Sequence, residues 1–205
     1  MANNPLIFSP VSLLTPMDIK SGYAPVNGLK LYYEMRGSGR PLVLLHGGVG
    51  ASEMFDPLMP ALAEKRKTVA VHLQGHGHTV DIPRPLRFES MADDIAAMIK
   101  YLNLVDADLM GYSLGGGVAL QTAIRHPEVV RRLVLISAPF KQHGFFDEVL
   151  AGMAQLSPEA ARFMSQSLSP NATLRPIGRS CSANSATCCG SPTIGRRKPP
   201  RSNLR

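Results

Sequence analysis

The amino-acid sequence predicts an α/β fold built on a doubly wound, mostly parallel sheet. Between residues 23 and 139, short apolar runs alternate with segments of helical periodicity, which is the pattern of repeated strand–helix units. Several of these runs are apolar without interruption, as is typical of strands buried on both faces of a parallel sheet. The chain has 205 residues, which is the length of one ordinary domain.

The first half of this pattern predicts three strands and one helix. Residues 29–35 form an early strand, and the apolar run 41–45 follows it after a glycine-rich break. Ser52 is a suitable N-cap for a helix that ends near residue 63. Residues 68–73 then form the next strand.

The next elements are a loop over residues 74–88 and a helix. Ser90 followed by Asp93 resembles a capping box, with Asp in the place of the usual Glu or Gln. The apolar residues of this helix fall on one face, which we expect to pack on the sheet: Ile95, Met98, Ile99 and Leu102.

The last predicted elements alternate in the same way. A strand over residues 108–112 precedes a helix over 114–125, and a strand over 132–137 follows it. Residues 145–168 have a helical pattern, in which Ser157-Pro158-Glu159 is a good helix start.

The segment Gly111-Tyr112-Ser113-Leu114-Gly115 carries the strongest chemical signal, because it lies between a predicted strand and a predicted helix. A serine on such a tight turn needs small neighbours, and the glycines at 111 and 115 supply the room. Its hydroxyl is then presented at the carboxyl edge of the sheet. The sequence therefore predicts Ser113 as a nucleophile.

A second segment predicts the groups that would stabilise an oxyanion. The apolar strand 41–45 leads into His46-Gly47-Gly48, so this turn can offer the Gly48 N–H. The Leu114 N–H, at the positive end of the following helix, is the expected second donor.

Several other interpretations of these motifs are weaker. A chance glycine-rich turn is the alternative for an isolated pentapeptide, but the strand–turn–helix setting favours the nucleophile. We expect His46 and His76 to be structural, because no carboxylate or cysteine lies at metal-ligand spacing from His76. No phosphate-binding loop or dinucleotide fingerprint is present, so we predict neither a metal nor another cofactor.

These motifs together resemble the α/β-hydrolase family over residues 22–166. The matching segments occur in family order: Leu-Leu-His-Gly-Gly at 44–48, Gln-Gly-His-Gly at 74–77, the turn 111–117 and His-Pro-Glu-Val-Val at 126–130. The resemblance implies hydrolysis of an ester or related acyl bond of a small molecule, without a cofactor. It implies Ser113 as nucleophile, Gly48 and Leu114 as the oxyanion hole, and Gly111 and Gly115 as the glycines of the elbow.

The chain departs from the family in two places. His72 stands where relatives usually have Asp. The family order of a catalytic triad is Ser, acid, His, but the only histidines after Ser113 are His126 and His143. Neither follows a strand that carries an acid, so we expect the acid, the catalytic histidine and the C-terminal strands to be missing. Activity should then be low, and a non-catalytic fragment or binding module is the alternative.

The end of the chain differs in composition from the rest. Residues 166–205 hold seven basic and no acidic side chains, which accounts for the net charge of +7, and they contain no Val, Met, Phe, Tyr or Trp. Codons that fit the amino-acid sequence from Pro176 onward can be read in a frame shifted by two bases. In that frame they can encode a helix-like segment followed by Pro-Thr. We therefore expect the chain to be out of frame or truncated from about residue 166.

Four regions follow from these observations. We expect a disordered extension at 1–16, with Met17 as an alternative start, a hydrolase core at 17–140, the start of a helical cap at 141–168, and a basic tail at 169–205.

Composition also bears on the partners and the location. The tail's spread-out charges lack interleaved aromatics, so a nucleic-acid function has little support, and Cys181, Cys188 and Cys189 lack a histidine for a zinc site. No segment approaches the length of a membrane span and no signal peptide is recognisable, so we expect a cytoplasmic protein. The oligomeric state is left open.

Overall fold

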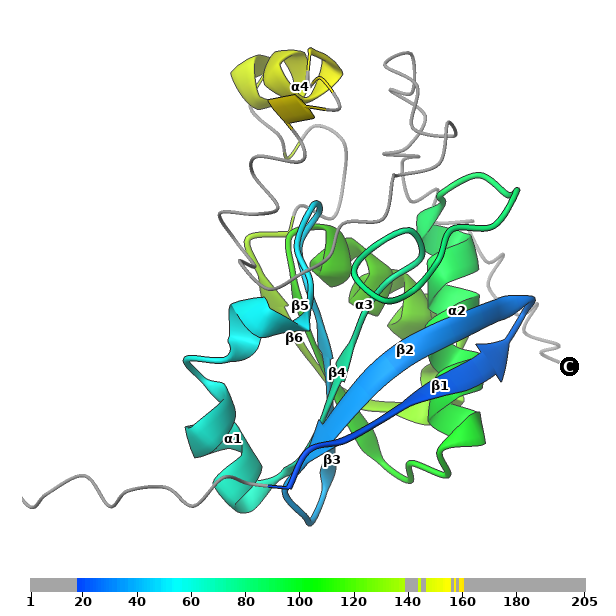
Figure 1. Ribbon diagram of the computed structural model, residues 1–205, viewed down its shortest axis with the longest axis vertical. Helices are drawn as coiled ribbons and strands as arrows, with labels where there is room; N and C mark the ends of the chain where they lie inside the picture. Colours follow the sequence, from blue (N-terminus) through cyan, green and yellow to red (C-terminus); the bar gives the residue numbers. More distant parts are fainter. Residues whose placement is uncertain (1–17, 139–143, 145–146, 156, 158, 161–205) are drawn as a thin grey trace, which may run out of the picture.

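The computed structural model describes residues 18–138, 144, 147–155, 157 and 159–160 (Figure 1). The predictions for the 1–16 extension, for Met17 and for the basic tail with its cysteines lie outside the described residues. So do His143 and most of the predicted cap region.

The described part of the chain is built around a six-stranded sheet with the order β1-β2-β4-β3-β5-β6. The strands are β1 (Lys20–Val26), β2 (Leu29–Arg36), β3 (Pro41–Leu45), β4 (Lys67–Val71), β5 (Ala107–Tyr112) and β6 (Val130–Ile136). The first two pair antiparallel, and β2 is also antiparallel to β4. The four strands from β4 to β6 run parallel, as the sequence predicts for a mostly parallel sheet.

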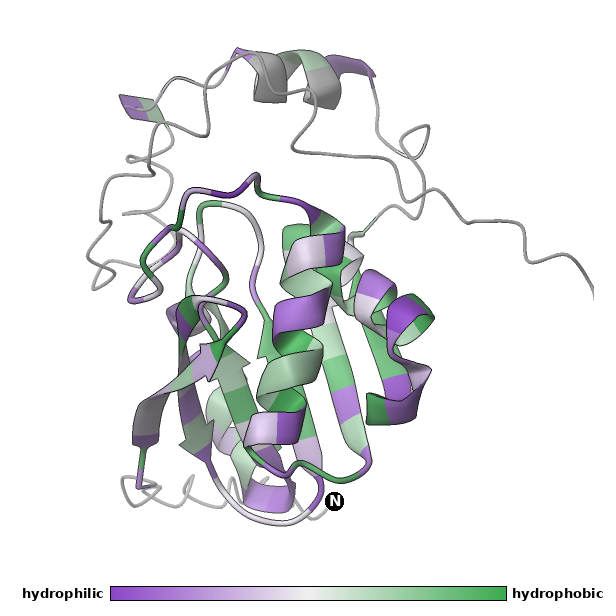
Figure 2. Ribbon diagram, turned by 90° about the vertical axis from the view of Figure 1, so that its right-hand side faces the viewer, coloured by the Kyte–Doolittle hydropathy of each residue, from purple (hydrophilic) through white to green (hydrophobic). Residues whose placement is uncertain are grey.

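Helices cover both faces of the sheet, which makes it doubly wound. The helical elements are η1 (Ser52–Phe55), α1 (Met59–Lys65), α2 (Phe88–Tyr101), α3 (Leu114–Arg125), η2 (Pro127–Val129) and α4 (Asp147–Ala154). In Figure 2, α2 faces the viewer and carries both hydrophilic and hydrophobic residues, whereas the strands behind it are largely hydrophobic.

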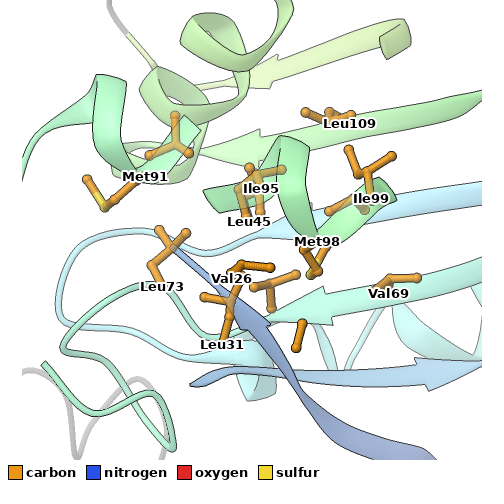
Figure 3. Close-up of a cluster of buried hydrophobic side chains, with 14 of the residues drawn as sticks. Val26, Leu31, Leu45, Val69, Leu73, Met91, Ile95, Met98, Ile99 and Leu109 are labelled. Carbon is orange, nitrogen blue, oxygen red and sulfur yellow. The ribbon is translucent and has the colours of Figure 1, made fainter. Parts of the chain in front are cut away.

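The central strand β3 shows why a continuous apolar run is needed. Val43 and Leu45 pack in the cluster that α2 and α3 share with the sheet. Leu42 and Leu44 point the other way and pack with Phe55 of η1 and with α1. Since successive side chains of a strand point to opposite faces, burial on both sides requires apolar residues at every position. Figure 3 shows the first cluster, with Leu45 beside Ile95 of α2.

Two predicted helix starts are wrong. Ser52 does not cap a long helix: it begins the short η1, and its hydroxyl bonds to a histidine ring instead. A second helix, α1, starts only at Met59, with Pro60 in its first turn, where a missing N–H is tolerated. The Ser90–Asp93 capping box is also wrong, because α2 already begins at Phe88 and has no side-chain cap.

Most other elements agree with the sequence analysis. The bounds of β3 and α3 match the prediction, and the apolar face of α2 is buried at Ile95, Met98 and Ile99. The prediction missed β1 as a strand, because Gly22 and Pro25 interrupt its pattern. Pro25 fits there because β1 lies at the edge of the sheet.

Candidate active site

Ser113 lies on the turn between β5 and α3, with backbone angles of φ 50° and ψ −114°. An L-residue pays a conformational cost in this region, so neighbouring bonds must hold it there. The Ser113 N–H donates to the Ile136 carbonyl at 2.9 Å. The Ser113 carbonyl accepts the N–H groups of Gly116 and Gly117 at 3.0 and 3.2 Å. The turn is thus fixed from both sides, by β6 and by the first turn of α3.

The glycines around this turn are required by close packing. A Cβ on Gly111 would lie 2.2 Å from the Gly115 carbonyl oxygen. A Cβ on Gly115 would lie 2.2 Å from the Leu45 carbonyl oxygen. Both contacts are with backbone, which has little freedom to move away. These positions therefore let α3 start directly against β3 and β5.

The glycine turn after β3 lies beside Ser113. A Cβ on Gly47 would be 3.5 Å from the Ser113 Cβ, and one on Gly48 would be 4.0 Å from the Leu114 Cβ. The structure therefore brings together the two segments that the sequence singled out, from the carboxyl ends of neighbouring strands.

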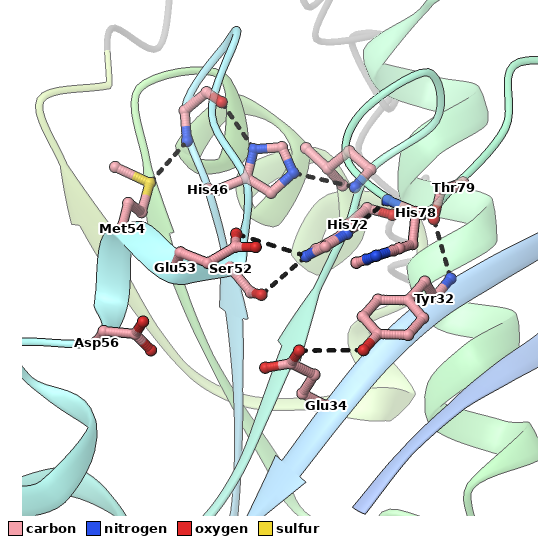
Figure 4. A network of polar contacts seen from close by, with 12 residues as sticks. Tyr32, Glu34, His46, Ser52, Glu53, Met54, Asp56, His72, His78 and Thr79 are labelled. Atoms are coloured by element: carbon pink, nitrogen blue, oxygen red, sulfur yellow. Dashed lines mark hydrogen bonds and ion pairs between the residues drawn. The ribbon is translucent and has the colours of Figure 1, made fainter. Parts of the chain in front are cut away.

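Three hydrogen bonds orient this turn, as Figure 4 shows in part. The Gly47 carbonyl lies 2.7 Å from His46 Nδ1 and accepts the Gly50 N–H at 3.2 Å. The Gly47 N–H donates to Met54 Sδ at 3.4 Å. Because a trans peptide points its C=O and N–H in opposite directions, the Gly48 N–H points away from His46. Within the described residues, neither this N–H nor that of Leu114 donates to another group.

His46 has both ring nitrogens engaged. Its Nδ1 donates to the Gly47 carbonyl, and its Nε2 accepts the Leu73 N–H at 3.1 Å. The side chain is fully buried, and burial lowers its pKa well below the ordinary value. His76 likewise uses Nδ1 to bond the Gln74 carbonyl at 2.9 Å within its own loop. These bonds agree with the structural role that the sequence predicts for both histidines.

His72 forms an arrangement that the sequence analysis missed. Its Nδ1 accepts the His78 N–H at 2.8 Å, so the proton of the neutral ring is on Nε2. Nε2 lies 2.8 Å from Ser52 Oγ and therefore donates to it. Burial, followed by the neighbouring His78 and His76, lowers the pKa of His72 to about 3. The histidine that replaces the usual Asp thus ties β4 to η1 (Figure 4).

Glu53 lies beside this pair without joining it. Its Oε2 is 3.9 Å from His72 Nε2, which is too far for a hydrogen bond. The same oxygen is buried and has no hydrogen-bond partner among the described residues. No motif in the sequence signalled this carboxylate.

The structure places no catalytic base against Ser113 within the described residues. His126 is at the far end of α3, where its Nε2 lies 2.7 Å from Asp93 Oδ1. No hydrogen bond joins a described imidazole to the Ser113 hydroxyl. Among the described residues, no group of three metal-ligating side chains occurs, and no helix is long and apolar enough to cross a membrane.

Comparison with known proteins finds relatives for this arrangement. A 2-hydroxymuconate semialdehyde hydrolase from a Pseudomonas species is 37% identical over 116 residues, which cover 54% of this chain and 41% of the relative. A pimeloyl-[acyl-carrier protein] methyl ester esterase from Neisseria meningitidis is 43% identical over 101 residues, covering 48% of this chain and 37% of the relative. The chain therefore matches well under half of the length of each.

Solved structures share the fold as well. An esterase from Exiguobacterium antarcticum superposes with a TM-score of 0.63 and 28% sequence identity, over 78% of this chain and 72% of the esterase. The sequence model of the alpha/beta hydrolase fold family matches residues 40–179, which is more than half of the chain. The protein belongs to the α/β-hydrolase fold family.

Proposed function

We propose that this chain carries the nucleophile and the oxyanion hole of a serine hydrolase that acts on an ester or related acyl bond. The observation that carries the proposal is the strained Ser113 turn, which lies beside two N–H groups without partners in the described residues, those of Gly48 and Leu114. Preorganised N–H donors at a nucleophile are the arrangement that acyl transfer requires.

The reaction would proceed in two steps. Ser113 Oγ attacks the substrate carbonyl carbon, and the N–H groups of Gly48 and Leu114 bind the oxyanion that develops. The positive end of the α3 dipole favours the same charge. Collapse of the intermediate breaks the bond to the leaving oxygen, which takes up the proton lost by Ser113 and departs as the alcohol, and it leaves an acyl group on Ser113. Water then attacks this acyl-enzyme, releases the carboxylic acid and restores the serine hydroxyl.

Both steps need a base, and we propose that the chain is impaired for want of one. In well-studied serine hydrolases, loss of a triad member leaves a residual acceleration of about 10³–10⁴ over water, from the oxyanion hole and binding. Among the described residues, no imidazole is hydrogen-bonded to the Ser113 hydroxyl, and His126, which bonds to Asp93, lies at the far end of α3.

The names of the relatives support a small acyl substrate. One is a methyl ester esterase and another is a semialdehyde hydrolase, so hydrolysis of small organic molecules recurs among them. The esterase fold match adds a third hydrolase of this type. We propose an ester of a small acid as the substrate class for this chain, with Ser113 as the residue that distinguishes the serine branch.

Rescue by added imidazole tests this proposal. The rate of p-nitrophenyl butyrate hydrolysis would be measured at increasing imidazole concentration for the wild type and for Ser113→Ala. The rate with Ser113→Ala gives the background reaction in solution and is subtracted from that of the wild type. We expect a slow protein-dependent rate that rises with imidazole only when Ser113 is present. Equal rates for the two proteins, with and without imidazole, would overturn the proposal.

A non-catalytic binding module is the second candidate, and the missing imidazole beside Ser113 is the observation that favours it. The same experiment separates the two, because a binding module would show no Ser113-dependent rate. It would still show cooperative thermal unfolding, which a poorly folded fragment would not.

A further inference from the structure

Among the strands that the structure describes, β6 is the last in the sheet, and none of them pairs with its outer side. The sheet order places β5 on its inner side and, in the part of the chain that is described, no strand on the other side. An edge strand of this kind presents a row of unpaired N–H and C=O groups to any strand that approaches.

The hydrogen bond to the Ser113 turn shows which residues of β6 carry these groups. The Ile136 carbonyl accepts the Ser113 N–H, so the backbone polar groups of Ile136 face β5. Because the backbone groups of successive strand residues point to opposite sides, those of Leu133 and Leu135 point outward. Among the described residues, these two therefore hold backbone donors and acceptors of β6 that no neighbouring strand uses.

The same stretch is apolar and exposed. Val134, Leu135 and Ile136 have 46, 39 and 38% of their surface exposed, although they follow one another in a strand. Successive side chains lie on opposite faces, so both faces of the sheet are apolar at this edge. The opposite edge differs: β1 carries Lys20 and Pro25, which oppose the addition of another strand.

We propose that this edge is a self-association surface, in which β6 pairs antiparallel with β6 of a second copy about a two-fold axis at Val134. In this register Leu133 of each copy forms a hydrogen-bonded pair with Leu135 of the other. Arg132 of each copy lies opposite Ile136 of the other. Arg131 falls opposite Ser137 and is bound to Asp108 of its own chain. No like charges therefore face each other, so the strand is complementary to itself.

The composition of the chain favours a second copy over a strand from its own tail. Residues 166–205 contain no Val, Phe, Tyr or Trp, which are among the residues enriched in strands. A two-fold pair of identical edges is also closed, because each strand covers the other and leaves no further edge at the interface.

Sedimentation equilibrium at increasing protein concentration tests the proposal on the full chain. We expect the mass to rise from one copy to two and to stop there. Leu135→Pro removes an outward N–H and leaves the bonds to β5 in place, so this variant should remain monomeric with an unchanged circular dichroism spectrum. Leu135→Lys, which brings two charges near the axis, serves as the second variant and should raise the dimer dissociation constant about tenfold or more.

The matched control is Val105→Lys, which makes a similar change at a residue that is 75% exposed and lies outside the sheet. It should dimerise like the wild type. A wild type that stays monomeric at every concentration would overturn the proposal. This is the result expected if another part of the same chain covers β6. A mass that rises beyond two copies, or a folded Leu135→Lys variant that dimerises normally, would overturn it as well.

Discussion

Ser52 and Ser113 both follow parallel strands at the carboxyl edge of the sheet, but among the described residues only Ser52 is hydrogen-bonded to a histidine. Ser52, after β3, has its hydroxyl 2.8 Å from His72 Nε2 but is only 2% exposed. Ser113, after β5, is partly exposed on a strained turn and has no hydrogen bond to an imidazole among the described residues. The serine–histidine distance alone would select Ser52, whereas the backbone geometry selects Ser113.

The two turns differ in whether the neighbouring backbone N–H groups already have hydrogen-bond partners. His72 Nδ1 already accepts an N–H, so its Nε2 carries the proton and cannot remove one from Ser52. At Ser113 the backbone is strained, and the neighbouring N–H groups of Gly48 and Leu114 remain without partners in the described residues. The bond of Ser52 therefore joins two elements of the fold, whereas Ser113 is the residue that we propose as the nucleophile.

The largest expected effect on stability comes from adding a side chain at the tightly packed glycine beneath the Ser113 turn. Gly115→Ala places a Cβ 2.2 Å from the Leu45 carbonyl oxygen, so α3 must move away from β3. We expect a loss of about 3 kcal/mol in the free energy of unfolding, measured with urea. Gly152→Ala in α4 is the control, since nothing lies within 4 Å of its added Cβ. Equal effects from the two substitutions would contradict the packing argument.

The next effect concerns pH and the Ser52 side of the comparison. The pKa of His72 is about 3 in the fold, against about 6.5 when unfolded, so the unfolded chain takes up a proton first as the pH falls. Stability is thus complete above pH 6.5 and is lost below it, by about 2 kcal/mol between pH 7 and 5 from this group. Urea unfolding at both pH values measures the loss.

His72→Gln isolates this contribution. Because glutamine does not titrate, the loss of stability between pH 7 and 5 should shrink by about 2 kcal/mol. His46 and His76, whose pKa values are also lowered by burial, keep part of the pH dependence. An unchanged difference between the two pH values would show that His72 is not buried in its neutral form.

Substitutions at the two serines should change stability in opposite directions. Ser113→Gly relieves the positive φ, and we expect it to stabilise the fold by about 1 kcal/mol relative to Ser113→Ala, which keeps the strain. Ser52→Ala leaves the buried Nε2–H of His72 without an acceptor, at a cost of about 1–3 kcal/mol. Thermal or urea unfolding of the three variants gives the signs, and a stabilising Ser52→Ala would contradict the comparison.

The smallest effect is expected at Met54. Met54→Leu keeps the volume but removes the sulfur that accepts the Gly47 N–H, so stability should fall by less than about 1 kcal/mol. The Ser113-dependent ester rate should fall with it, because the turn that carries Gly48 loosens. Met98→Leu in the core is the control for stability and should leave the rate unchanged. A rate that is equal in both variants would remove Met54 from this role.

The sequence was sufficient to predict the elements around Ser113. The apolar run of β3 is explained by burial on both faces of the sheet. The glycines at 111 and 115 are explained by close contact with neighbouring backbone. The bounds of α3 followed from the same turn. The predicted roles in catalysis remain proposals.

The two wrong helix starts arose at serines whose side chains could have served as helix caps. Ser52 could cap a helix or bond to a distant ring, and the sequence does not reveal that His72 lies beside it, 20 residues later in the chain. Ser90 matched a capping pattern, but α2 starts earlier, at Phe88. Such choices depend on tertiary contacts, which local patterns do not encode.

Mass mapping of the acylated residue tests the central claim most directly. The chain would be incubated with p-nitrophenyl acetate, whose good leaving group favours acylation, and digested for peptide mapping. No described imidazole bonds to Ser113, so deacylation should be slow, and we predict that the acetyl group accumulates on Ser113, also in Ser52→Ala, and that it is lost in Ser113→Ala. Acetylation of Ser52, or a pattern unchanged in Ser113→Ala, would contradict the account.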